Sequence, residues 1–77
     1  MNKVLFFAHL RDEAGVESAE IEAVGKTVAE LKEIVAETYK LGKLDSAMAA
    51  INEEFAPNEE VIQEGDVIAF IPPVSGG

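Results

Sequence analysis

The order of apolar and polar residues predicts two β-strands at the start of the chain. Lys3–Leu10 is rich in residues that favour β-structure, and Ser18–Ala23 alternates apolar residues with glutamates. Arg11–Gly15 lies between them, is polar and ends in glycine, so we predict a turn that joins the strands as a hairpin. Alternation along the first strand gives two faces, one with Val4, Phe6 and Ala8 and the other with Leu5, Phe7 and His9.

The next segment has the period of an amphipathic helix. Thr27 and Glu30 form a capping box, in which each side chain accepts a hydrogen bond from the other residue's main-chain amide. One buried stripe follows at a spacing of three and four residues, made of Val28, Leu31, Ile34, Val35 and Thr38. The solvent-facing residues are expected to be Lys32, Glu33 and Glu37. Leu41–Gly42 supplies a C-terminal stop.

Short β-segments follow the helix. Ala47–Ile51 predicts a third strand, Asn52–Glu54 a turn, and Phe55 the start of a short return strand. After a turn at Gln63–Asp66, Val67–Ile71 predicts a last strand. Its two faces carry Ile68 and Phe70 on one side and Val67, Ala69 and Ile71 on the other.

The element order β-β-α-β-β-β predicts an α+β fold. A mixed sheet with one main helix packed across one face buries the single apolar stripe of the helix. Pro72–Pro73 prevents further ladder pairing after the last strand. We therefore expect one domain over residues 1–71 and a flexible tail over residues 72–77.

The acidic net charge of the chain limits the classes of molecule that it is expected to bind. The chain carries 15 acidic and 6 basic residues, and every base lies at or before Lys43. Such a surface repels nucleic acid and anionic lipid and steers the protein toward a basic partner, although a merely solubilising face is the alternative interpretation. The sequence has no cysteine, no charged-then-apolar leader and no apolar run of about 20 residues, which favours a cytoplasmic protein.

No group of side chains has the pattern of an active site. His9 is the single histidine and alternates with Leu5 and Phe7, which is typical of a surface or interface residue. The acidic pairs Glu53–Glu54 and Glu59–Glu60 have diverging side chains and are interpreted as solvated charges. We therefore expect no bound cofactor, no metal ion and no catalysis by the isolated chain.

The remaining candidate for reactivity is the main-chain carboxylate of Gly77. Gly76 and Gly77 have no side chains, so they can enter a narrow channel and adopt the main-chain angles that a partner imposes. A carboxylate oxygen is a poor leaving group, but transfer of AMP to it creates a good one, and a sulfur donor can then attack the carbonyl carbon. A frayed chain terminus is the alternative interpretation of the two glycines.

Three segments resemble the small-subunit family of molybdopterin synthase. They are Val4–Ala8 with Arg11–Asp12, then Ala50–Phe55, and most specifically Glu64–Gly77. The resemblance runs the length of the chain and implies a ubiquitin-like β-grasp fold. In that fold the first and last strands would lie side by side and parallel at the centre of the sheet. Asp12 and His9 depart from the family pattern, but neither is at the reactive end.

The resemblance also implies a role as sulfur carrier in molybdenum cofactor biosynthesis. An ATP-dependent, E1-like adenylating enzyme would activate Gly77, which then becomes a thiocarboxylate. The tail, through Val74, Ser75 and Gly76, would enter the large subunit of molybdopterin synthase and pass sulfur to a cyclic pterin precursor. A heterotetramer of two small and two large subunits is expected, and ATP would be used by the activating partner alone.

An apolar surface is the expected docking site. By the same resemblance Phe7, Phe55 and Ile71 lie on the sheet face away from the helix, where relatives dock both partners. Alternation also leaves Phe7 and Ile71 outside a core that needs only Phe6, Ile21, Leu31, Val35, Ile68 and Phe70. An exposed apolar patch usually marks an interface, unless the loop around Phe55 covers it.

Three other functions stay open. A sulfur carrier for thiamine thiazole synthesis would share the fold, the Gly-Gly end and the adenylation step. A ubiquitin-like modifier would instead become conjugated to lysines. A pure binding module, such as an acidic inhibitor of a basic enzyme, would not need Gly76 and Gly77.

Overall fold

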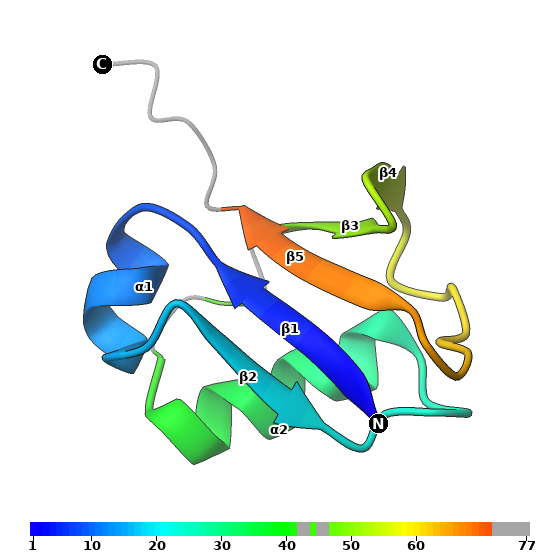
Figure 1. Ribbon diagram of the computed structural model, residues 1–77, viewed down its shortest axis with the longest axis horizontal. Coiled ribbons are helices and arrows are strands. Elements are labelled where there is room, and N and C mark those ends of the chain that lie inside the picture. Colours follow the sequence, from blue (N-terminus) through cyan, green and yellow to red (C-terminus); the bar gives the residue numbers. More distant parts are fainter. Residues whose placement is uncertain (42–43, 45–46, 72–77) are drawn as a thin grey trace.

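Five strands and two helices make up the fold within residues 1–41, 44 and 47–71, which the computed structural model describes. The strands are β1 (Asn2–Phe6), β2 (Ser18–Ile21), β3 (Met48–Ile51), β4 (Glu54–Ala56) and β5 (Val67–Ile71). The helices are α1 (His9–Ala14) and α2 (Val28–Tyr39). The strands form one mixed sheet in the order β2-β1-β5-β3-β4, and α2 packs across one face of it (Figure 1). The predicted α+β architecture is confirmed.

The centre of the sheet is the parallel pair β1 and β5. Their register runs from Lys3 opposite Val67 to Phe6 opposite Phe70. The other neighbours, β1 with β2, β5 with β3 and β3 with β4, are antiparallel. The first and last strands therefore end side by side, as Figure 1 shows, which confirms the expected central pair.

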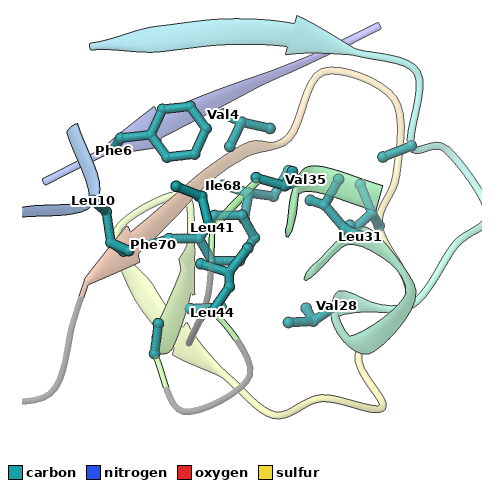
Figure 2. Packing of buried hydrophobic residues seen from close by; sticks show 14 residues of the cluster. Val4, Phe6, Leu10, Val28, Leu31, Val35, Leu41, Leu44, Ile68 and Phe70 are labelled. Atoms are coloured by element: carbon teal, nitrogen blue, oxygen red, sulfur yellow. The ribbon is translucent and has the colours of Figure 1, made fainter. Parts of the chain in front are cut away.

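The core lies between the sheet and α2. Side chains from β1, β5 and α2 converge there, among them Phe6, Phe70 and Leu31 (Figure 2). Of the six predicted core residues, Ile21 is only partly buried and the other five are buried. In the predicted helix stripe, Val28, Leu31 and Val35 are buried and Ile34 is half-buried, whereas Thr38 is exposed. Thr38 was therefore placed on the wrong face, because the stripe continues from Val35 through Tyr39, which packs against the core.

Lys32 is buried, so the prediction that it faces solvent is wrong. Its side chain is 7% exposed, and its Nζ donates to the main-chain oxygen of Ala47 at 2.8 Å and to Oδ1 of Asn58 at 3.0 Å. Position 32 follows Val28 by one helical turn and so lies on the buried stripe. A lysine is tolerated there because its methylene stem covers apolar surface while the ammonium reaches oxygen acceptors.

Helix α1 replaces the predicted turn at Arg11–Gly15. Strand β1 ends at Phe6, and Ala8, which was expected to face inward from a strand, is exposed with a φ of 54°. His9 therefore begins a helix and does not continue the strand. Leu10 is buried and Ala14, one turn later, packs against the core, so the helix has its own apolar side. Gly15, at φ 80°, ends it and donates to the oxygen of Arg11 at 2.9 Å.

The capping box of α2 is confirmed. Thr27 Oγ1 accepts from the amide of Glu30 at 3.2 Å, and Glu30 Oε1 accepts from the amide of Thr27 at 2.9 Å. The hydrogen bond from the Thr27 amide lowers the pKa of the Glu30 carboxyl. The helix ends at Tyr39 with Lys40 in the left-handed region at φ 57°, while the predicted stop at Gly42 lies outside the described residues.

A buried amide fastens the start of the central pair. The side chain of Asn2 is 1% exposed, and its Nδ2 donates to the main-chain oxygens of Gln63 at 2.8 Å and Asp66 at 3.0 Å. Its Oδ1 accepts from the amide of Ala23 at 3.3 Å. Asn2 thus connects β1 with the segment after β2 and with the turn that leads into β5.

Truncation of the core should unfold much of the protein. Leu31→Ala and Phe70→Ala each leave a cavity between α2 and the sheet and should cost about 2–5 kcal/mol of unfolding free energy. The exposed helix residue Glu33 is the control, because Glu33→Ala should change stability by less than about 0.5 kcal/mol. Denaturant melts measure all three, and parent-like stability of both core variants would contradict the packing described here.

Loss of the Asn2 amide should also destabilise the fold. Asn2→Ala leaves the amide of Ala23 and the oxygens of Gln63 and Asp66 without their partner, at a cost of about 1–3 kcal/mol. Lys3→Ala is the control, because Lys3 is exposed on the neighbouring position of β1. If both variants melt at the same temperature, Asn2 does not stabilise the central pair.

Candidate functional site

The sheet face away from α2 carries an apolar pocket of about 530 Å³. Its lining residues come from β1, β3, β4 and β5 and the segments next to them: Leu5, Phe7, Ala50, Asn52, Glu53, Phe55, Val67, Ala69 and Ile71. Strand alternation explains the composition, since Ile68 and Phe70 point into the core and their neighbours Val67, Ala69 and Ile71 point the other way. The sequence of β5 therefore forms the core and this face at the same time.

A row of cross-strand pairs gives the face its hollow. Phe55 of β4 lies opposite Ala50 of β3, Ala50 lies opposite Ala69 of β5, and Ala69 lies opposite Leu5 of β1. The two alanines at the middle of the row are small, and larger side chains flank them. The result is a depression that an apolar side chain of a partner can fill.

The three predicted interface residues share this pocket. Phe7 is 45% exposed and Phe55 is 70% exposed, whereas Ile71 is half-buried at the end of β5. Phe7 lies one residue beyond the end of β1 and lines the pocket together with Leu5, on the side that alternation along this segment predicts. The loop around Phe55 does not cover the patch, because Phe55 is itself the most exposed large apolar residue of the described chain.

The turn between β3 and β4 is fixed to the start of β5. The main-chain amide of Asn52 donates to the main-chain oxygen of Val67 at 2.8 Å, and the side-chain Oδ1 of Asn52 accepts from the main-chain amide of Val67 at 3.0 Å. Asn52 Nδ2 also donates to Oδ1 of Asp66 at 2.9 Å. These hydrogen bonds hold the edge of the pocket that carries Asn52 and Glu53.

The described residues show no candidate metal site. They contain no cluster of three or more histidine, cysteine, aspartate or glutamate side chains that could hold a metal ion. Neither described helix is long and apolar enough to cross a membrane. The pocket itself is lined mainly by apolar side chains, with Asn52 and Glu53 as its polar residues, which suits the binding of a protein surface.

Comparison with known proteins places the chain in a family. The model of the ThiS family matches residues 4–77.

The chain belongs to the ThiS family.

Two curated relatives of this ThiS-family chain are molybdopterin synthase sulfur carrier subunits. The protein from Haemophilus influenzae is 37% identical and that from Escherichia coli is 36% identical, and both alignments cover the whole of both chains. These relatives confirm the resemblance that the sequence segments indicate.

Solved structures confirm the β-grasp architecture of this ThiS-family chain. A protein from Pyrococcus furiosus, assigned as subunit 1 of a molybdopterin converting factor, is 33% identical with a TM-score of 0.77, covering 95% of this chain and 97% of that one. In a complex of subunits 1 and 2 of this factor from Helicobacter pylori, the matching chain is 29% identical with a TM-score of 0.69, covering 99% and 97%. The small archaeal modifier protein 1 of Methanosarcina acetivorans is 25% identical with a TM-score of 0.79, covering 99% and 95%.

Part of the predicted site lies outside the described residues of this ThiS-family chain. Val74, Ser75, Gly76 and Gly77 belong to that part. The described chain reaches Ile71, which lies opposite Met48 of β3 and lines the apolar pocket. The described chain therefore ends, at Ile71, on the rim of the exposed apolar face.

The sequence analysis did not assign several of the residues that line the pocket. Leu5 and Ala69 were placed on the outward face but were not assigned to a site, and Glu53 was interpreted only as a solvated charge. Alternation within β3 would have placed the side chain of Ala50 on the other face of the sheet from that of Ala49. The contribution of Asn52 and Glu53 could not be found this way, because it depends on how the turn lies against β5.

Proposed function

We propose that this chain is the sulfur carrier subunit of molybdopterin synthase and that the carboxyl carbon of Gly77 carries the sulfur. The full-length match to two bacterial sulfur carrier subunits is the observation that carries the proposal. The geometry supports it, because the chain leaves β5 at Ile71, on the rim of the apolar face. A partner that docks on this face therefore contacts the chain at the end of β5.

The chemistry needs no side chain of this protein. The carboxylate of Gly77 attacks the α-phosphate of ATP, pyrophosphate leaves, and an acyl-adenylate forms in the activating enzyme. A sulfur donor then attacks the carbonyl carbon, AMP leaves, and a thiocarboxylate results. In the large subunit its sulfur bonds to an electrophilic carbon of the pterin precursor and displaces an oxygen leaving group from that carbon. Water then cleaves the acyl–sulfur bond, which regenerates the carboxylate and leaves the sulfur on the pterin.

Two partners use the carrier in turn. An E1-like adenylating enzyme supplies the ATP site, and the large subunit supplies the pterin site and the acid–base groups. The complex of subunits 1 and 2 of the molybdopterin converting factor in Helicobacter pylori supports a large-subunit partner. We extend this to an assembly of two small and two large subunits.

Protein modification is the second candidate function. It is favoured by the similarity to the small archaeal modifier protein 1 of Methanosarcina acetivorans. Both functions begin with adenylation of the same carboxylate, but a modifier ends in an isopeptide bond to lysine. Mass spectrometry of tryptic digests from the host separates them, because a modifier leaves residues of its own C-terminus on partner lysines and a carrier leaves none.

Truncation of the apolar face should weaken docking without unfolding the protein. Phe7→Ala and Phe55→Ala should each reduce the affinity for the large subunit by about 1–4 kcal/mol, since buried apolar anchors carry most of an interface's energy. Val24→Ala is the control, because Val24 is similarly exposed but does not line the pocket. Calorimetric titration measures the affinities, and parent-like values for both phenylalanine variants would place the interface elsewhere.

Deletion of Gly77 should abolish sulfur transfer while docking persists. The variant still ends in a carboxylate, but this group lies about 3.5 Å short of its reactive position. A misplacement of even 1 Å can reduce a rate about a hundredfold. Addition of one residue after Gly77 should be equally damaging, because the required carboxylate becomes part of a peptide bond.

The test reconstitutes the carrier with the large subunit, the adenylating enzyme, ATP and a sulfide source, and measures the pterin dithiolene. Ser75→Ala is the matched tail variant, since it retains the chain length and both terminal glycines. Near-normal product from the variant that lacks Gly77 would refute the sulfur-carrier function and favour a binding module.

A further inference from the structure

The turn between β3 and β4 holds a glutamate in a main-chain conformation that favours glycine. Ile51 and Glu54 are paired, so the loop between them has two residues, Asn52 at φ 51° and Glu53 at φ 72°. Positive φ at both positions is the arrangement of a type I′ turn, for which Asn-Gly is the preferred sequence. Asn52 suits the first position, but at the second the β-carbon of Glu53 crowds the main chain.

No hydrogen bond or ion pair of the Glu53 side chain within the described residues offsets this strain. Within the described residues its carboxylate makes neither a hydrogen bond nor an ion pair. Every lysine and arginine of the chain lies at or before Lys43, so the sequence around the turn offers no basic neighbour. A glycine would form the same turn with less strain.

Glu53 lies at the polar edge of the apolar pocket. It lines the pocket together with Phe7, Phe55 and Ile71. The adjacent Glu54 does not; it lines a neighbouring depression, which shares Asn52 and Phe55 with the pocket but does not include Glu53. Two neighbouring glutamates of equal charge are therefore directed to different surfaces, and only one of them faces a partner docked in the pocket.

We propose that Glu53 is a specificity-determining residue of the docking face, which forms an ion pair with an arginine or lysine of the large subunit beside the apolar side chain that fills the pocket. This rests on the proposed function, which supplies the partner. A second copy of this chain is the wrong occupant, because two chains with a net charge of −9 each repel one another.

The experiment compares two variants of Glu53 with a neighbouring control. Glu53→Gln removes the charge and retains the shape, Glu53→Gly also relieves the turn, and Glu54→Gln removes the same charge one residue away. Association with the purified large subunit is measured by biolayer interferometry at about 50 mM and 500 mM salt, and the melting temperature of each free variant is recorded.

Both Glu53 variants should bind about three- to tenfold more weakly at low salt, mainly through slower association, and the difference should shrink at high salt. Glu53→Gly should at the same time melt a few degrees above the parent protein, because the strain is relieved. A higher melting temperature combined with weaker binding would show that Glu53 destabilises the free protein but strengthens binding to the large subunit. Glu54→Gln should bind within twofold of the parent.

Three outcomes would overturn the proposal: parent-like binding of Glu53→Gln, an equal loss in Glu54→Gln, or a salt-independent loss in the Glu53 variants. The parent protein is assayed in parallel for dithiolene product. If product forms and Glu53→Gln binds normally, only the role of Glu53 is refuted. If the parent forms no product, the proposed function fails, whatever the binding data show.

Discussion

The parallel pairing of β1 with β5 is the constraint on which the rest of the structure depends. It brings Phe6 opposite Phe70, and so joins the two ends of the described chain at the centre of the sheet. The pairing buries Val4 and Phe6 beside Ile68 and Phe70 against α2. Because the two strands are parallel, they also finish at the same end of the sheet, and Phe7 and Ile71 there line one pocket. Asn2 fastens the opposite end of the pair with hydrogen bonds to three main-chain groups.

Strand β5 has two roles that its alternation keeps separate. Ile68 and Phe70 stabilise the fold, while Ala69 and Ile71 form part of the exposed face. As a central strand, β5 is hydrogen-bonded to a neighbour on each side, β1 and β3. The exposed apolar face is thus held by the same strand pairing that holds the core.

Much of this fold could be predicted because its signals are local. The capping box at Thr27 and Glu30 needs residues only three positions apart, and strand alternation needs only next neighbours. Helix α1 was missed because its apolar side consists of Leu10 and Ala14 alone, directly after a run of β-formers. Lys32 was misplaced because its oxygen partners, at Ala47 and Asn58, belong to segments far along the chain.

The sequence by itself determined the type and order of most elements, the two faces of the last strand and the acidic character of the second half. The candidate reactive group at Gly77 was also identified from sequence, and it stays a prediction. Only the tertiary structure decided which residues share the pocket, and that Glu53 lies in it while Glu54 does not. The physical reason is that hydrogen bonding and side-chain periodicity act between near neighbours, whereas a surface is assembled from strands whose register is fixed by contacts across the whole chain.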